Sequence, residues 1–233
     1  MDLKFEAEAV LFDKDGTLIH YDASWAPYVP KLFEKLAPER EDIWEEMAHA
    51  VGFDIQTEKF IVGSIAVNGT FEDVIAVLER FVGPIDMQNA LAADTYAHQY
   101  TQPAPVGDLN ALLEDFKSKG LKLGVVTNDL IAATEKQLKQ MDNRDMFDVI
   151  YCADSGPQPK PAGDMITAAC RDLGIAPERV AMVGDSTHDL HAGRAAGVGL
   201  KVGVLTGPAK HDDIDAFADI VLSDIHQLPA YLI

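Results

Sequence analysis

Four groups of polar residues along the chain combine types that suit chemistry on a phosphate beside a metal ion. In chain order they are Asp13 with Asp15; Thr127, Asn128 and Asp129; Lys160; and Asp185 with Asp189. Carboxylates cost free energy when they are buried without a partner. They also repel each other when several gather in a low dielectric. A shared site for these residues would therefore need a compensating cation.

The side-chain types indicate which chemistry such a site would support. Oxygen ligands with few carboxylates suit Mg²⁺, which often shares a substrate phosphate. A threonine hydroxyl and a lysine ammonium suit phosphoryl oxygens, and a carboxylate beside them can act as a nucleophile. Each group also has an ordinary explanation, such as Asp185 and Ser186 capping a helix or Lys160 lying in solvent. It is their joint occurrence that favours the catalytic interpretation.

Each polar group stands at the end of a segment that is typical of a buried strand. Residues 7–13 read "AEAVLFD", an apolar run that indicates a strand buried on both faces. Further strands are expected at 121–127, 147–152, 179–184, 200–205 and 218–223, and helical patterns at 108–120, 131–142, 163–175 and 189–197 separate most of them. This alternation predicts an α/β fold with a doubly wound, mostly parallel sheet, in which ligands bind at the carboxyl ends of the strands.

An all-helical insertion is predicted to interrupt this α/β unit directly after the first aspartates. Helical spacing of apolar residues recurs at 25–37, 40–51, 70–82 and 87–100, with Thr70 as an N-cap. We therefore expect a core domain of residues 1–20 and 104–233 and a helical cap domain of residues 21–103. Pro103, Pro105 and Gly107 mark the second joint.

Composition excludes some classes of partner. The net charge is −19, from 19 Lys and Arg against 38 Asp and Glu, so nucleic acid and anionic membranes are not expected as partners. No apolar run has the length of a membrane span, and the N-terminus has no signal-peptide pattern. Cys152 and Cys170 are expected to be reduced thiols in the core. A cytoplasmic protein, monomeric or homodimeric, follows as the default expectation.

The four motifs together resemble those of the haloacid dehalogenase-like hydrolase superfamily. They read "DKDGT", "TND", Lys160 and "GDSTHD" in that order. The helical insertion after the first motif resembles the C1-capped, phosphoglycolate phosphatase-like branch. The order is specific in combination, although each motif alone is weak.

The resemblance implies a Mg²⁺-dependent phosphatase for a small phosphorylated metabolite, with phosphoglycolate as the default substrate of the branch. Asp13 would be the nucleophile that forms an aspartyl phosphate, and Asp15 the general acid and then the general base. Thr127, the backbone of Asn128 and Lys160 would bind the phosphoryl group. Mg²⁺ would be held by Asp13, the backbone carbonyl of Asp15, Asp185 and Asp189.

Other positions bear on specificity. Lys14 stands where many members of the superfamily have an apolar residue, and we expect it to face away from Asp13. If Asp13 and Asp15 lie in an extended segment, they point to the same side. In the insertion, Ser64 and Asn68 are candidates for binding the leaving group. Tyr21, Trp25 and Lys59 are further pocket candidates, although packing is the more ordinary role for Trp25.

Three alternatives remain open at this stage. One is a phosphomutase of the β-phosphoglucomutase type, although the cap has no clear arginine-rich motif for a second phosphate. A second is a non-turnover phospho-switch that resembles a response-regulator receiver domain, which the length and motif order disfavour. A third is an inactive binding protein on the same fold, because fold alone does not fix function.

Overall fold

The computed structural model describes residues 4–233, which divide into two compact units. The core unit consists of the chain up to Tyr21 together with Pro105–Ile233. The helical unit is Asp22–Ala104. None of the helices in the described residues is long and apolar enough to cross a membrane.

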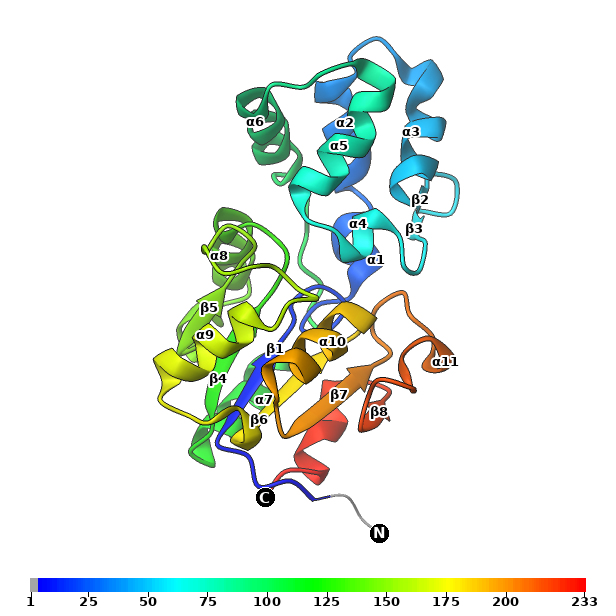
Figure 1. Ribbon diagram of the computed structural model, residues 1–233. Helices are drawn as coiled ribbons and strands as arrows, with labels where there is room; N and C mark the ends of the chain where they lie inside the picture. Colours follow the sequence, from blue (N-terminus) through cyan, green and yellow to red (C-terminus); the bar gives the residue numbers. More distant parts are fainter. Residues whose placement is uncertain (1–3) are drawn as a thin grey trace. The chain divides into compact units, whose positions relative to one another are not determined.

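The core unit is built on a parallel sheet whose strands, within the described residues, follow the order β5-β4-β1-β6-β7-β8 (Figure 1). They are β1 (Ala9–Phe12), β4 (Lys122–Val126), β5 (Val149–Tyr151), β6 (Val180–Gly184), β7 (Leu200–Val204) and β8 (Ile220–Leu222). The predicted doubly wound α/β architecture is confirmed. Because β1 lies between β4 and β6, the carboxyl ends of three adjacent strands bring the first, second and fourth motifs to one edge of the sheet.

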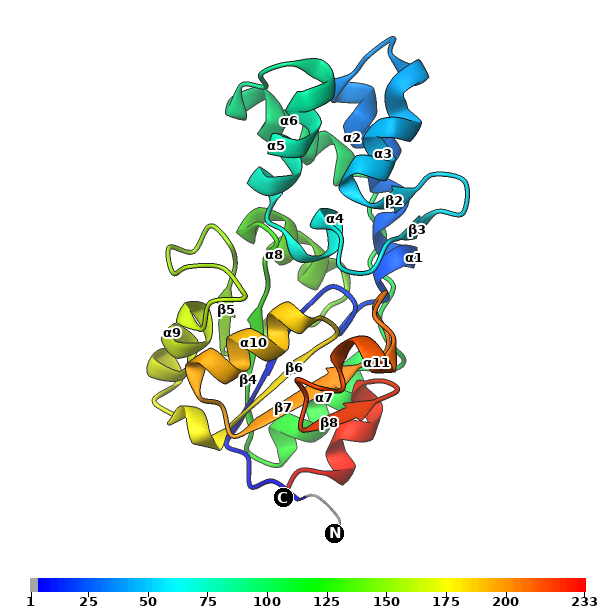
Figure 2. The ribbon, with the colours of Figure 1, turned by 45° about the vertical axis from the view of Figure 1, so that its right-hand side comes forward.

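Helices cover both faces of this sheet. They are α7 (Leu109–Ser118), α8 (Ile131–Gln140), α9 (Asp164–Leu173), α10 (Thr187–Ala196) and α11 (His211–Ile214), with 3₁₀ turns at η2 (Arg144–Met146), η3 (Pro177–Arg179) and η4 (Ile225–Ala230). Successive residues of β1 point to opposite faces, as a strand requires. Val10 and Phe12 pack with α7 and η4. Ala9 and Leu11 pack with α9 and α10, which lie in front of the sheet in Figures 1 and 2.

The helical unit contains a helix in each of the four segments where the spacing predicts one. Its elements are α2 (Tyr28–Leu36), η1 (Glu41–Ile43), α3 (Trp44–Val51), α4 (Ile65–Asn68), α5 (Phe71–Val82) and α6 (Met87–Ala97), while α1 (Tyr21–Trp25) begins in the core unit. The Thr70 cap is confirmed, because its hydroxyl accepts from the Asp73 N–H and the Asp73 carboxylate accepts from the Thr70 N–H. This reciprocal pair satisfies two donors at the start of α5.

The unit also contains a small antiparallel hairpin that the helical spacing did not predict. It pairs β2 (Phe53–Asp54) with β3 (Lys59–Phe60). Gly52, with a φ of 86°, ends α3 in the left-handed conformation that favours glycine. The Asp54 carboxylate then accepts hydrogen bonds from the Gln56 and Thr57 N–H groups, which closes the turn. Two residues per strand are too few to produce a period-two pattern in the sequence.

Candidate active site

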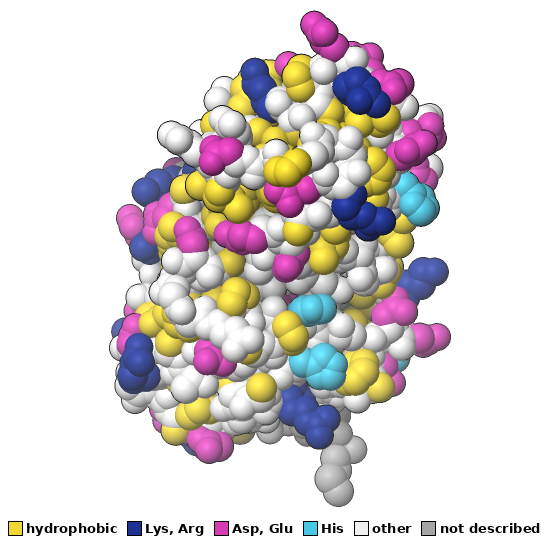
Figure 3. Space-filling model, turned by 45° about the horizontal axis from the view of Figure 1, so that its top comes forward, with side chains coloured by type: hydrophobic (Ala, Val, Ile, Leu, Met, Phe, Trp, Pro, Cys, Tyr) yellow, Lys and Arg dark blue, Asp and Glu magenta, His cyan; other side chains and the backbone are white. Residues whose placement is uncertain are grey.

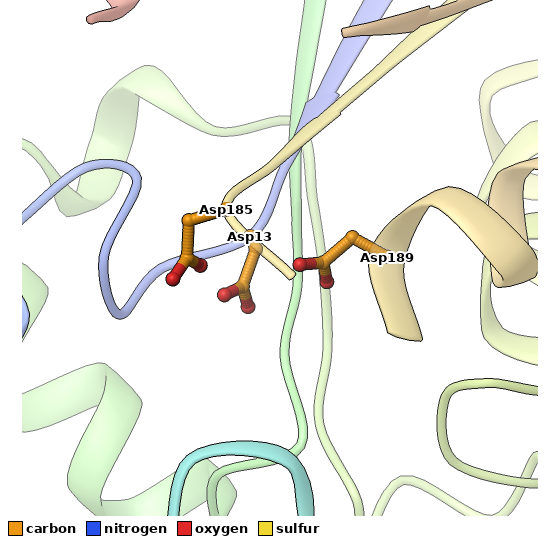
Figure 4. Close-up of side chains that lie close together, drawn as sticks. All are labelled: Asp13, Asp185 and Asp189. Carbon is orange, nitrogen blue, oxygen red and sulfur yellow. The ribbon is translucent and has the colours of Figure 1, made fainter. Parts of the chain in front are cut away.

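Three carboxylates converge at the carboxyl edge of the sheet (Figure 4). Asp13 follows β1, Asp185 follows β6, and Asp189 lies in the first turn of α10. One oxygen of each lies within 4.8 Å of one oxygen of each of the others, and all three residues are buried. The geometry therefore gathers three of the four aspartates that were expected to hold the metal.

Lys160 places one positive charge among these acids. Its Nζ donates to Asp13 Oδ1 at 2.7 Å, to Asp189 Oδ1 at 2.6 Å and to the Val126 carbonyl at 2.8 Å. Burial acts to lower the pKa of Lys160, but the two carboxylates outweigh it and the pKa is raised. The ammonium is therefore charged, and it links the ends of β1, β4 and α10.

Burial dominates the electrostatics of the acids themselves. It raises the pKa of Asp13 to about 7, with Lys160 opposing the shift and Asp189 and Asp15 adding to it. Burial, followed by repulsion from Asp189 and Asp13, raises the pKa of Asp185 well above its ordinary value. When all three carboxylates are ionised, they exceed the single ammonium by two negative charges, and their mutual repulsion adds to the rise of these pKa values. That imbalance and the all-oxygen donor set fit a hard divalent cation such as Mg²⁺.

The second motif lies beside Lys160. Asn128 Nδ2 donates to the Lys160 carbonyl and the Lys160 N–H donates to Asn128 Oδ1, both at 2.9 Å. Thr127 is buried, and its Oγ1 accepts from the Asp129 N–H at 3.2 Å, which leaves the hydroxyl proton to be donated. The side chain of Asn128 therefore has a structural task, and binding of the phosphoryl group by its backbone stays a prediction.

Asp15 lies outside the cluster of three carboxylates. The chain bends at Lys14, whose carbonyl accepts from the Leu18 and Ile19 N–H groups, so the extended geometry expected for Asp13 to Asp15 is interrupted. The Asp15 carboxylate instead contacts the ammonium of Lys14, with Nζ at 2.8 Å from Oδ1. A carbonyl ligand from Asp15 to a metal stays a prediction.

Glycines shape the site in a way that sequence reasoning missed. A Cβ atom on Gly207, in the segment after β7, would lie 1.7 Å from Asp185 Oδ2, and one on Gly16 would lie 2.4 Å from the same oxygen. Thr206 Oγ1 donates to the Gly16 carbonyl at 2.6 Å, which ties the two segments together. The sequence signal that could have placed Thr206 and Gly207 at the site was their position just after the strand predicted at 200–205.

The sequence offered Asp185 and Ser186 together as caps of the helix in the fourth motif, but only Ser186 has that role. Ser186 is the N-cap of α10, and its N–H and hydroxyl both donate to Asp189 Oδ2 at 3.0 and 2.6 Å. Since Lys160 occupies the other oxygen of Asp189, this carboxylate is fixed from both sides. Asp185 takes no part in that cap and belongs to the cluster of acids.

The remaining pocket candidates occupy different environments. Tyr21 is buried in the core unit, where burial and then the Asp15 and Asp185 carboxylates raise the pKa of its phenol well above the ordinary value. Trp25 makes edge contacts with Tyr28 and His98 in the helical unit, which agrees with a packing role. Lys59 is exposed on β3.

Ser64 is the N-cap residue of α4, and Asn68 is the last residue of that helix. Ser64 Oγ is buried, yet within the described residues it has no hydrogen-bond partner. A Cβ on Gly52 would lie 2.0 Å from Ser64 Cβ, so the glycine makes room for this serine. Both side chains belong to the helical unit.

Away from the site, the cysteines and the surface charges can be compared with the sequence. Cys152 and Cys170 are free and buried, as predicted. The face seen in Figure 3 carries acidic side chains scattered over it, with basic side chains between them. On that face the described residues form no continuous basic patch of the kind that binds a nucleic-acid backbone.

Comparison with known proteins agrees with this geometry. The family model for haloacid dehalogenase-like hydrolase matches residues 7–197. A protein of Clostridium perfringens named as a pyrophosphatase, PpaX, is 30% identical over 190 residues, covering 82% of this chain and 80% of that protein. A phosphoglycolate phosphatase of Aquifex aeolicus is 28% identical over 188 residues, covering 81% and 80%.

The fold has close counterparts among solved structures. The crystal structure of CbbY from Rhodobacter sphaeroides in complex with phosphate superimposes with a TM-score of 0.71. It covers 97% of this chain and 99% of its own, at 22% sequence identity. At that identity the likeness concerns the fold.

Proposed function

Since the chain belongs to the haloacid dehalogenase-like hydrolase family, we propose that it is a Mg²⁺-dependent phosphatase that hydrolyses a small phosphate monoester through an aspartyl phosphate on Asp13. The observation that carries the proposal is the contact of the Asp13 carboxylate with Lys160 inside the cluster of three acids. A buried carboxylate held beside a fixed ammonium is a nucleophile placed next to charge compensation for a phosphoryl group.

The proposed metal site uses the excess negative charge of this cluster. Asp13, Asp185 and Asp189, with the backbone carbonyl of Asp15, would hold Mg²⁺. The bound ion would neutralise the carboxylates and the phosphoryl oxygens and so allow an anionic substrate to approach an acidic centre. A net charge of −19 makes such local compensation necessary, because the overall field repels anions.

In the proposed first step, an oxygen of Asp13 forms a bond to phosphorus while the bond from phosphorus to the ester oxygen breaks. Asp15 donates a proton to the leaving alcohol. Throughout this step the Thr127 hydroxyl, the Asn128 N–H and the Lys160 ammonium stabilise the phosphoryl oxygens. In the second step Asp15 takes a proton from water, the water oxygen attacks phosphorus, and Asp13 is released with inorganic phosphate.

For the substrate we propose a small phosphorylated metabolite, with phosphoglycolate as the first to test. Two relatives are named for phosphoglycolate and pyrophosphate hydrolysis, which supports a phosphate-bearing substrate. The two names leave open which leaving group the phosphate is attached to. The helical unit is proposed as the cap that selects this leaving group. Its clearest candidate is Ser64, whose buried Oγ has no partner among the described residues, with Asn68 beside it on α4.

We also propose that the protein works in the cytoplasm as a monomer or homodimer. Two free, buried thiols are compatible with a reducing compartment. The scattered acidic surface in Figure 3 supports neither nucleic acid nor an anionic membrane as a partner.

The test is phosphate release from a panel of monoesters, with pyrophosphate included, in the presence of Mg²⁺ and of a chelator. We expect Mg²⁺-dependent release from at least one small ester and loss of release in Asp13→Asn. Conversion of a sugar phosphate to its isomer without free phosphate would identify a mutase instead. A phosphorylated protein that does not turn over would identify a phospho-switch.

A further inference from the structure

A buried lysine lies beside Asp15 within the first motif, and none of the roles proposed so far uses it. The Lys14 side chain is 0% exposed, although lysine is seldom fully buried unless it is paired. Its Nζ lies 2.8 Å from Asp15 Oδ1 and 2.7 Å from Oδ2. Contact with both oxygens fixes the plane of the carboxylate as well as its position.

The same ammonium also contacts two residues beyond the end of β4, one in the loop that follows the strand and one in α8. Nζ forms an ion pair with Asp129 Oδ2 at 3.1 Å and donates a hydrogen bond to Gln137 Oε1. These partners are themselves fixed, because Asp129 Oδ1 accepts from the Leu130 N–H at 2.7 Å and Gln137 is fully buried in α8. Lys14 therefore joins the end of β1 to the segment that follows β4.

Lys14 is charged in this environment. Burial acts to lower its pKa, but Asp15 and Asp129 outweigh burial and the pKa is raised. From the sequence we expected this side chain to face away from the nucleophile and made no prediction about its burial. Of the three partner residues named here, Asp15 is the next residue in the chain, whereas Gln137 is 123 residues away.

We propose that Lys14 is a positioning residue that holds the Asp15 carboxylate in the orientation from which it exchanges a proton with the leaving group and with water. This inference rests on the proposed function, in which Asp15 is the general acid and base. A lysine that only fills the core would instead affect folding or all substrates alike.

Lys14→Met tests the inference through the leaving group. The value of kcat/KM covers the steps up to departure of the alcohol. An alkyl alkoxide needs a proton to leave, whereas p-nitrophenolate leaves without one. We expect kcat/KM for an alkyl ester such as phosphoglycolate to fall about 100-fold, and kcat/KM for p-nitrophenyl phosphate to fall less than about threefold.

A double-mutant cycle identifies the residue through which Lys14 acts. In an Asp15→Asn background, Lys14→Met should cause no further loss on the alkyl ester beyond about twofold. Because Lys14→Met leaves two partly buried carboxylates without their cation, Lys14→Met combined with Asp129→Asn serves as a second variant. It removes one positive and one negative charge, and it should show the same loss confined to the alkyl ester.

Melting curves of all variants accompany the kinetics. Equal losses on both esters, or losses that multiply in the Asp15→Asn background, would overturn the positioning role while the phosphatase stands. A wild-type protein that hydrolyses neither ester would overturn the proposed function, and this inference with it.

Discussion

The side-chain amide of Asn128 and the backbone of Lys160 are joined by two reciprocal hydrogen bonds of 2.9 Å. This pair holds the segment after β4 against the segment that carries Lys160. The Lys160 ammonium then reaches Asp13 and Asp189. The position of the charge in the site therefore depends on an amide that need not touch the substrate with its side chain.

Asn128→Ala should release the Lys160 backbone. We expect kcat to fall at least about 10-fold, because a displaced ammonium no longer faces the phosphoryl group, and the free energy of unfolding to fall by about 1–3 kcal/mol. Steady-state kinetics and denaturant unfolding give the two values. Asn110→Ala is the matched control, since Asn110 Nδ2 donates to the Met141 carbonyl in the core unit. It should lose stability and keep its kcat.

Asp13→Asn should stabilise the metal-free protein at alkaline pH. Burial raises the folded-state pKa of Asp13 to about 7, above the ordinary value of 3.8, although Lys160 opposes this shift. The folded state therefore binds the proton more tightly than the unfolded state does, and wild-type stability falls as pH rises between these two values. The variant carries no such charge, so its advantage should grow to the order of 1–4 kcal/mol by about pH 8.

Urea unfolding in chelator at about pH 5 and about pH 8 measures this difference. Asp212→Asn is the control, because that carboxylate is fully exposed and its removal should not change the pH dependence. If the stability advantage of Asp13→Asn stayed constant across this range, it would contradict a folded-state pKa of Asp13 that burial raises to about 7.

How much of this site follows from the sequence depends on the kind of signal. Asp13, Asp185 and Asp189 were identified because each stands at or just beyond the end of an apolar strand, and parallel strands bring such ends to one edge. Lys160 was identified only through its place among the motifs. Its three contacts connect segments that no local periodicity relates.

Other features had no local signal. Lys14 is buried because Asp129 and Gln137 approach it in the fold, whereas its type alone favours solvent. The bend at Lys14 replaces the extended geometry on which the period-two argument for Asp15 relied. Gly207 gave no pattern of its own, since its role is the absence of a side chain beside Asp185.

Gly207→Ala should displace the Asp185 carboxylate. The added Cβ would lie 1.7 Å from Oδ2, too close for any relaxed contact. We expect stabilisation by Mg²⁺ to weaken and kcat to fall at least about 10-fold, because a positioned ligand is lost. Melting temperature as a function of Mg²⁺ concentration measures the first effect. A variant with wild-type Mg²⁺ dependence would remove Asp185 from the proposed metal site.

Ser64→Ala should separate substrate recognition from folding in the helical unit. Removal of a buried hydroxyl without a partner among the described residues should leave stability unchanged or raise it by up to about 1 kcal/mol. If Ser64 binds the leaving group, KM for the best substrate should rise at least about fivefold, while KM for p-nitrophenyl phosphate stays constant.

Ser24→Ala is the matched control in the same unit. Ser24 Oγ accepts from the Ala104 N–H at 3.1 Å, so this variant should lose stability and keep its KM. An unchanged KM in Ser64→Ala for every ester in the panel would withdraw Ser64 from substrate recognition.

The most direct measurement is the site of covalent phosphorylation during turnover. Wild-type protein is mixed with p-nitrophenyl phosphate and Mg²⁺, quenched rapidly in acid and analysed by mass spectrometry of its peptides. We expect a phosphoryl group on the peptide that contains Asp13, and we expect it to be absent in chelator and in Asp13→Asn. Release of phosphate by Asp13→Asn at the wild-type rate, or a phosphoryl group on any other residue, would contradict the proposed mechanism.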